Sequence, residues 1–168
     1  MQRETSVTTR QIATAGIVGA LYAAVTVGLA PLSYGPIQVR VAEGLTVLPF
    51  LTPWAIPGLY FGCMVANVFG GLGPVDIFGG SFITLVAACG TYLLRRTGKE
   101  WLAPLPPIVA NALGVSLYLH RIAAMPYWLT CLYVGAGELI ACFGLGYPLL
   151  LVLRRRFPAG QGSREGTS

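Results

Sequence analysis

The sequence predicts an all-α membrane protein built as a six-transmembrane-helix bundle. Hydrophobic residues make up 55% of the 168-residue chain and charged residues only 10%, whereas about 25% of the residues in soluble domains are charged. The few charges are separated by long uncharged runs, and a membrane-spanning helix needs about 20 mostly apolar residues. These runs have room for six spans and leave little chain for a soluble domain.

Prolines and glycines mark where the six helices end. The breaks read "APLSYGP", "LTP", "GGLGP" and "AAMP", and such clusters interrupt helices. The predicted helices cover residues 9–30, 39–51, 54–69, 76–94, 104–121 and 126–153. The second and third are short for a complete crossing, which predicts tilt, a kink or a thinner side of the bundle there. Residues 1–156 then form one membrane domain, and the Gly- and Ser-rich tail 157–168 is expected to be disordered.

The basic residues predict the orientation of the bundle. Six spans place both termini on one side, together with nine of the eleven lysines and arginines. Only Arg40 and Arg121 fall on the other side. Because basic residues accumulate on the inner side of membrane proteins, both termini are expected to be cytoplasmic, in a multi-pass protein of the cell membrane. The loops near residues 31–39, 70–75 and 122–126 then face outward.

The helix at 9–30 carries two adjacent stripes of small residues. They recur at four-residue spacing, as Ala15, Gly19 and Ala23 and as Gly16, Ala20 and Ala24. Such faces let another helix approach closely. Packing inside the bundle would explain them, but a doubled stripe on the first helix also fits docking of a separate membrane subunit, which is the interpretation we favour.

The helix at 39–51 begins with two opposite charges. Arg40 and Glu43 lie three residues apart, and an ionisable residue inside a span costs about 2.5–3.5 kcal/mol on insertion scales unless it is paired or solvated. One interpretation is a salt bridge across the first helical turn, with Arg40 reaching the outer interface. The other keeps this bridge and makes it one wall of a pocket that opens outward.

Asp76, at the start of the predicted helix 76–94, also has two interpretations. It follows Gly73 and Pro74, and acidic residues are favoured in the first turn of a helix because they stabilise its free N–H groups and its dipole. A capping role is therefore at least as good an explanation as contact with a ligand.

The last two helices present polar stripes. Asn111 and Tyr118 share one face, and Tyr127 and Glu138 share another, because seven or eleven residues return to nearly the same side of a helix. Glu138 lies about 16 Å below Tyr127 at helical rise, near the middle of a bilayer. Two facing stripes of this kind suit a flat polar molecule that enters from outside. The alternative is a hydrogen bond between Asn111 and Glu138 that serves packing alone.

Several kinds of chemistry lack their motifs in this sequence. The Gly-Lys pair in "TGKE" has neither the upstream glycine nor the following Ser or Thr of a nucleotide-binding loop, so ATP-driven work needs another subunit. The four cysteines lie singly in apolar runs, which predicts no metal site, and no nucleophile motif is present. The basic clusters flank apolar spans, a pattern of membrane topology and not of nucleic-acid binding.

Three longer stretches carry a family resemblance. They are "IQVRVAEGLTVLPFLTPWAIPGLYFGCMVANVFGGLGPVDIFGG", "PLPPIVANALGV" and "YVGAGELI". Through them, residues 9–153 resemble the queuosine-precursor transporter family (QueT type), substrate-binding S components of energy-coupling factor (ECF) transporters. The resemblance implies an S-component fold in the plasma membrane of a prokaryote, and an outward substrate site capped by the loop between the first two helices. It also implies that the small residues of the first helix dock on a transmembrane coupling subunit. Two cytoplasmic ATPases would drive that subunit.

The implied substrate is a 7-deazaguanine such as preQ1, preQ0 or queuine, and no cofactor is expected in this chain. The residues expected to bind the substrate are Glu43, Asn111, Tyr118, Tyr127, Trp128 and Glu138, with Arg40 and Asp76 beside them. Glu138 would accept the N–H donors on one edge of the base, and Asn111 would bind the ring carbonyl or amino group. One of the three aromatic residues would stack on the base.

The cationic amine of preQ1 or queuine has its own expected partner. Glu43, or second to it Asp76, would bind this amine, and Arg40 would position Glu43 and balance its charge. Two other function classes remain possible from the residues alone, a membrane-embedded enzyme and a packing protein without a ligand. The closest alternative is an S component for another small vitamin, which should tolerate loss of Glu138 better than a deazaguanine transporter would.

Overall fold

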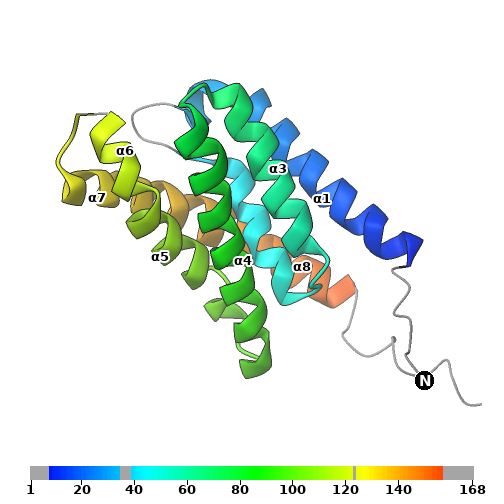
Figure 1. Ribbon diagram of the computed structural model, residues 1–168. Helices are drawn as coiled ribbons and strands as arrows, with labels where there is room; N and C mark the ends of the chain where they lie inside the picture. The colour runs from blue at the N-terminus through cyan, green and yellow to red at the C-terminus, as the bar shows by residue number, and fades with distance from the viewer. Residues whose placement is uncertain (1–7, 35–38, 123, 157–168) are drawn as a thin grey trace, which may run out of the picture.

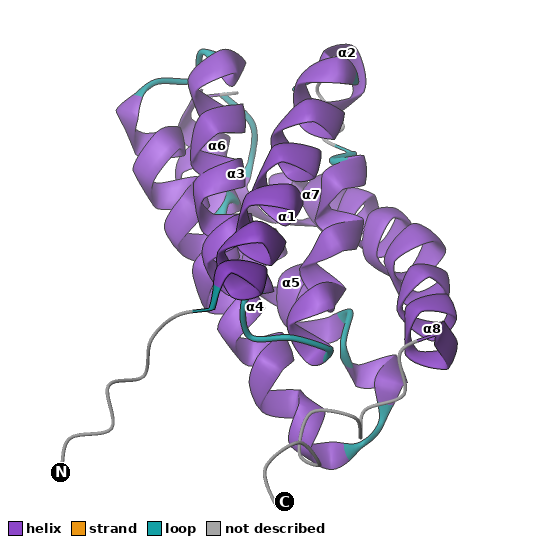
Figure 2. Ribbon diagram, turned by 90° about the vertical axis from the view of Figure 1, so that its right-hand side faces the viewer, coloured by secondary structure: helices purple, strands orange, loops and turns teal. Residues whose placement is uncertain are grey.

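The computed structural model describes residues 8–34, 39–122 and 124–156. Every regular element among these residues is a helix, and none is a strand (Figure 2). Residues 35–38 of the loop expected to cap the site, and the tail 157–168, lie outside the described residues. The all-helical fold class is confirmed.

The helices follow one another with short connections (Figure 1). The first half of the chain contains α1 (Thr9–Gly28), α2 (Ala30–Ser33), the 3₁₀ helix η1 (Val41–Phe50) and α3 (Ala55–Gly70). A π-helical turn, η2 (Val75–Gly80), runs into α4 (Ser81–Leu94), followed by the short 3₁₀ turns η3 (Arg95–Thr97) and η4 (Glu100–Leu102). The second half contains α5 (Leu105–Gly114), α6 (Ser116–Ile122), α7 (Tyr127–Leu139), the π-helical η5 (Ile140–Gly146) and α8 (Tyr147–Arg156).

Among the described residues, helices cover each of the predicted segments, but these differ in length. Three are long and apolar enough to cross a membrane, namely Thr9–Gly28, Val75–Thr97 and Tyr127–Arg156. A fourth is obtained if Glu100–Gly114 and Ser116–Ile122, which are bent by 40° at their junction, count as one span. Val41–Phe50 and Ala55–Gly70 are apolar but shorter, as the sequence predicted for these two. Length and composition thus support three or four spans.

Local sequence explains where the segments break. The N–H of Thr8 donates to Oε1 of Gln11 at 2.8 Å, which gives a backbone N–H group at the N-terminus of α1 a hydrogen-bond partner. Gly71 ends α3 with a φ of +70°, a left-handed conformation that costs glycine little. Pro49 lies inside η1 and lacks the N–H that a regular helix would use.

Glycines bring the central helices very close together. A Cβ atom on Gly58 of α3 would lie 2.5 Å from the carbonyl oxygen of Ala15, and one on Gly62 would lie 2.6 Å from that of Gly19. A Cβ on Gly146 of η5 would likewise lie 2.6 Å from the carbonyl oxygen of Gly44 in η1. One small-residue stripe of α1 therefore packs against α3 inside the bundle, and η1 is held centrally between α1, α4 and η5.

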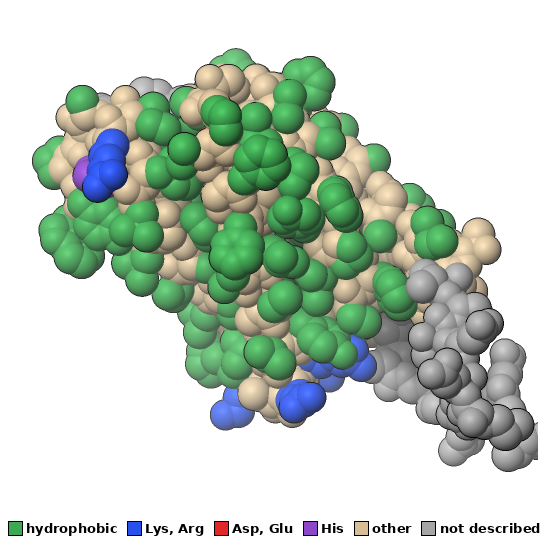
Figure 3. Space-filling model, viewed as in Figure 1, with side chains coloured by type: hydrophobic (Ala, Val, Ile, Leu, Met, Phe, Trp, Pro, Cys, Tyr) green, Lys and Arg blue, Asp and Glu red, His purple; other side chains and the backbone are tan. Residues whose placement is uncertain are grey.

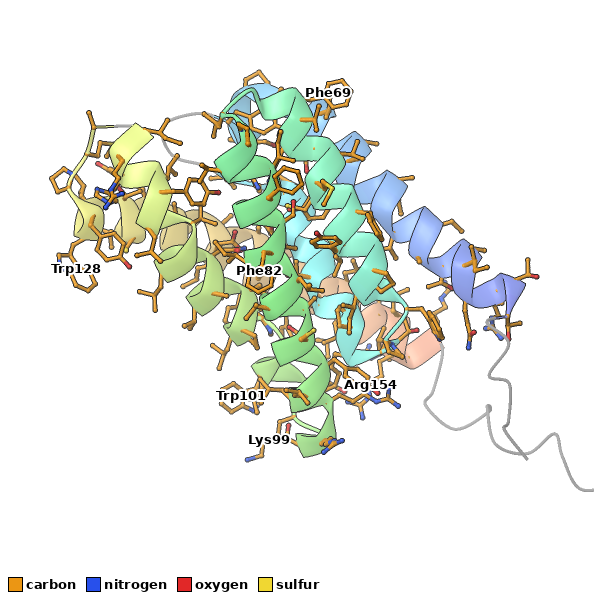
Figure 4. The ribbon with its side chains drawn as sticks, viewed as in Figure 1. Phe69, Phe82, Lys99, Trp101, Trp128 and Arg154 are labelled. Carbon is orange, nitrogen blue, oxygen red and sulfur yellow. The ribbon has the colours of Figure 1, made fainter. Side chains whose placement is uncertain are left out.

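Apolar side chains cover the flanks, and charge gathers at one end. Phe69 and Phe82 are 66% and 60% exposed, and both point outward from the helices in Figure 4. Figure 3 shows this hydrophobic flank, with Lys and Arg side chains gathered below it and a smaller basic group over α6 at the other end. Exposed apolar surface of this extent suits contact with lipid.

Candidate substrate site

Two buried carboxylates from distant parts of the chain form the centre of the candidate site. Glu43 lies in the first turn of η1 and Glu138 near the end of α7, and their side chains are 1% and 5% exposed. Oε1 of Glu43 accepts a hydrogen bond from the hydroxyl of Tyr22 on α1. Oε1 of Glu138 accepts one from Nδ2 of Asn111 on α5, at 2.9 Å. Four helical elements thus converge on these two acids.

A small cavity lies between the two carboxylates. Its lining consists of Arg40, Glu43, Asn111, Val115, Val134 and Glu138. Its volume is about 10 Å³, which is room for about one water molecule. A bicyclic base therefore enters only if the lining side chains move apart. Four of the sequence-predicted residues meet at this cavity.

Several polar atoms around the cavity have no hydrogen-bond partner among the described residues. They are Nε and Nη2 of Arg40, Oε2 of Glu43, Oδ2 of Asp76 and Oδ1 of Asn111. A buried polar group without a partner costs about 1–3 kcal/mol. Both donors and acceptors are left over, which is the arrangement that a polar ligand with its own donors and acceptors would satisfy.

Arg40 pairs with Asp76, so the predicted bridge between Arg40 and Glu43 is wrong. Nη2 of Arg40 lies 3.8 Å from Oδ2 of Asp76, close enough for attraction but too long for a hydrogen bond. The reason is local, because Arg40 precedes the first turn of η1 in an extended conformation. The three-residue helical spacing that the prediction used does not apply there.

Asp76 links three parts of the structure. Its Oδ1 accepts a hydrogen bond from the Tyr118 hydroxyl at 2.6 Å, and its backbone carbonyl accepts one from Nδ2 of Asn67 at 2.8 Å. No side-chain cap hydrogen bond starts η2. Asp76 thus lies in the first turn of η2, as the capping interpretation expects, but its carboxylate makes no cap hydrogen bond and faces Arg40 and Tyr118 instead. Tyr118 does not line the cavity and is connected to Arg40, which does, through Asp76.

Tyr127 and Trp128 lie away from the cavity, contrary to their predicted stacking role. Trp128 is 74% exposed and points away from the bundle in Figure 4. The Tyr127 hydroxyl donates to the Leu113 carbonyl oxygen at 3.1 Å, and its ring contacts that of Trp128 with centroids 5.0 Å apart. Helical periodicity gave the correct face for Glu138, but it could not tell that the first turn of α7 lies beyond the cavity.

The sequence analysis missed three side chains of the network. Tyr22 is completely buried and bonds to Glu43. Asn67 bonds to Asp76, and the Cys142 thiol lies 3.5 Å from Oε2 of Glu138 and 3.4 Å from the Glu43 carbonyl oxygen. A signal for Tyr22 existed, because it shares the buried face of α1 with Val18 and Thr26 at four-residue spacing. Its polar hydroxyl inside an apolar run needed a partner.

A separate groove of about 510 Å³ lies on the surface of α1 and α3. Ala15, Gly16, Gly19, Ala20 and Ala23 line it from α1. The stripe of Ala15, Gly19 and Ala23 is half-buried, whereas Gly16, Ala20 and Ala24 are exposed. A Cβ atom on Gly16 would meet nothing within 4 Å. One predicted stripe thus serves internal packing, and the other remains open on the surface.

The fold and the site together define a class of protein. A helical membrane bundle in which buried charged side chains from several helices line one cavity is typical of proteins that carry small polar molecules across a membrane. The family described as QueT transporter matches residues 12–155. The chain therefore belongs to the QueT transporter family, which is a family of transporters and not of enzymes.

One curated relative covers most of the chain. The protein named Queuosine precursor transporter QueT from Lactococcus lactis subsp. cremoris (strain MG1363) is 32% identical over 148 residues, which cover 80% of this chain and 87% of that protein. No solved structure matches this chain. The family membership expected from the three sequence stretches is confirmed.

Proposed function

We propose that this transporter is the S component of an ECF transporter that takes up a 7-deazaguanine queuosine precursor. It binds preQ1, preQ0 or queuine from outside and delivers it inward. The observation that carries the proposal is the pair of buried carboxylates, Glu43 and Glu138, on one cavity with Arg40 and Asn111. The printed name of the Lactococcus relative supports the substrate class.

Substrate binding replaces contacts that the protein makes with itself. The N–H donors of the base edge bind the Glu138 carboxylate, which now accepts from Asn111. The released Asn111 amide then pairs with the ring carbonyl or amino group. The cationic amine of preQ1 or queuine binds Glu43, whose second oxygen has no partner among the described residues. Of the three predicted stacking residues, Tyr118 is the one connected to the cavity lining, through Asp76 and Arg40.

Six crossings with both termini in the cytoplasm are part of the proposal. The start of α1 and the end of α8 lie at the same end of the bundle in both ribbon views (Figures 1 and 2). The larger group of Lys and Arg side chains lies at this end, as expected for the cytoplasmic side. The two short segments, η1 and α3, complete the count in a thinner part of the bundle.

Energy for transport comes from other subunits in this proposal. The exposed stripe of Gly16, Ala20 and Ala24 supports docking of a transmembrane coupling subunit, because small residues allow close helix contact. Two cytoplasmic ATPases bound to that subunit use the ATP, since the sequence of this chain has no nucleotide-binding loop.

Equilibrium binding to the purified chain tests the substrate assignment. We expect preQ1, preQ0 or queuine to bind more tightly than guanine, and Glu138→Gln to weaken that binding by about 5- to 150-fold, the value of one good bidentate pair. Glu100→Gln is the matched control, because this carboxylate pairs with Arg154 outside the cavity. Unchanged binding in Glu138→Gln would exclude the proposed role, and binding of another vitamin in place of the deazaguanines would favour the alternative S component.

A further inference from the structure

A second pocket lies at the end of the bundle where α1 begins and α8 ends. Its volume is about 600 Å³. Three arginines line it, each from a different element: Arg10 of α1, Arg95 of η3 and Arg154 of α8. We call it the arginine pocket. It shares no lining residue with the cavity between the carboxylates.

The charges around the arginine pocket do not balance among the described residues. No acidic side chain lines it, and the carboxylate of Glu100 pairs with Arg154 from outside the lining. Arg95 lies over the ring of Tyr92 at 5.7 Å and, among the described residues, forms no ion pair. Of the three arginines that line the pocket, only Arg154 pairs with a described carboxylate, and the remaining positive charge favours an anion.

The other lining groups fit a phosphate ester. Thr14 and Thr52 add neutral hydroxyl groups to the arginines, and guanidinium groups bind phosphate oxygens in pairs of parallel hydrogen bonds. Gln11, two aromatic side chains (Phe50 and Trp54) and four aliphatic ones make up the rest of the wall. A phosphate group attached to an apolar body matches both parts of this lining.

The position of the pocket favours a lipid over a soluble anion. It lies where the basic end of the molecule meets the hydrophobic flank, the boundary that Figure 3 shows, and lipid head groups lie at such a boundary. The pocket also shares Gln11 and Trp54 with the apolar groove on α1 and α3. An acyl chain attached to the bound phosphate can therefore run directly along apolar surface.

We propose that the arginine pocket binds the phosphate group of an anionic phospholipid. This proposal is independent of the substrate assignment, because the two sites have no residue in common. The apolar groove is also the proposed docking face for the coupling subunit, so a lipid held at its end would border that interface.

Native mass spectrometry of the delipidated full chain in detergent tests the proposal. We expect one phosphatidylglycerol to bind more tightly than phosphatidylcholine with the same acyl chains. Arg10→Gln with Arg95→Gln should weaken phosphatidylglycerol binding by about 30-fold, since each basic residue near an anionic lipid surface contributes a factor of about 5. Arg155→Gln with Arg156→Gln is the matched control, because both side chains are exposed at the end of α8 and neither lines the pocket.

Four results would overturn the proposal. Equal losses in the two double variants would indicate general charge attraction. Competition by glycerol phosphate at the same concentration as the lipid would indicate a soluble phosphate ester. Equal binding of phosphatidylglycerol and phosphatidylcholine would show that the pocket does not select an anionic head group. Normal lipid binding by the Arg10 and Arg95 variant, with loss of assembly with a coupling subunit, would indicate an acidic protein segment. An unchanged melting temperature in each variant shows that the chain is folded.

Discussion

At the scale of single residues, the candidate site is a set of buried polar groups that satisfy one another incompletely. One carboxylate oxygen of Glu43 accepts a hydrogen bond from Tyr22, and the other has no partner among the described residues. The side-chain nitrogen of Asn111 donates to Glu138, but its side-chain oxygen has no described partner. In a medium of low dielectric such unpaired groups are costly. The ligand proposed above would supply the missing donors and acceptors, which would be a reason to keep two acids in the interior of a membrane protein.

Glu43 should distinguish charged from neutral precursors. Glu43→Gln keeps an oxygen that can accept from Tyr22 but loses the negative charge, so binding of cationic preQ1 should weaken more than binding of neutral preQ0. The expected difference is about 5- to 30-fold, because hydrogen bonds to charged groups are worth about 1–2 kcal/mol more than neutral ones. Competition binding with both compounds measures it. Equal losses for the two compounds would make Glu43 a purely structural residue.

At the scale of elements, breaks in the helices place the site residues. The 40° bend between α5 and α6 separates Asn111, which reaches Glu138, from Tyr118, which reaches Asp76. The sequence assigned Asn111 and Tyr118 to one face of one continuous helix. Both side chains do face the interior, but they lie on opposite sides of the bend and reach different partners. A bend angle depends on neighbouring helices, which the periodicity of one segment does not describe.

The two small-residue stripes of α1 should respond differently to a larger side chain. Gly16→Leu adds volume where nothing lies within 4 Å, so the variant should fold and bind deazaguanine normally but fail to assemble with the coupling subunit and to transport. Gly19→Leu on the packed stripe is the contrasting variant, because its Cβ would lie 2.9 Å from the Gly58 carbonyl oxygen, and it should lower the melting temperature. Normal assembly of Gly16→Leu would show that this stripe only contacts lipid.

At the scale of the whole molecule, the distribution of charge predicts how the bundle lies in the membrane. Val75 at the start of η2 and Lys99 after η3 flank one span, Val75–Thr97. In a chain without its native cysteines, Val75→Cys should react with a membrane-impermeant maleimide in intact cells. Lys99→Cys should react only after the membrane is opened. Both side chains are exposed, so burial does not limit labelling, and reaction of both from the same side would contradict the proposed topology.

The sequence by itself determined the helical membrane character of the chain, the approximate helix boundaries, the family, and the acids at the centre of the site. These follow from composition, from Pro and Gly breaks and from periodicity, all of which act within one segment. Glu138, Asn111 and Glu43 could be chosen because a charged or polar group in an apolar span needs a partner somewhere.

Only the tertiary structure decided which partners meet. It paired Arg40 with Asp76, brought Tyr22 to Glu43, moved Tyr127 and Trp128 away from the cavity, and left one stripe of α1 packed and the other open. The physical reason is that periodicity fixes a direction around one helix axis, whereas a contact between helices depends on their lengths, bends and closest approach. Here those are set by the glycines that join α1 to α3 and η1 to η5.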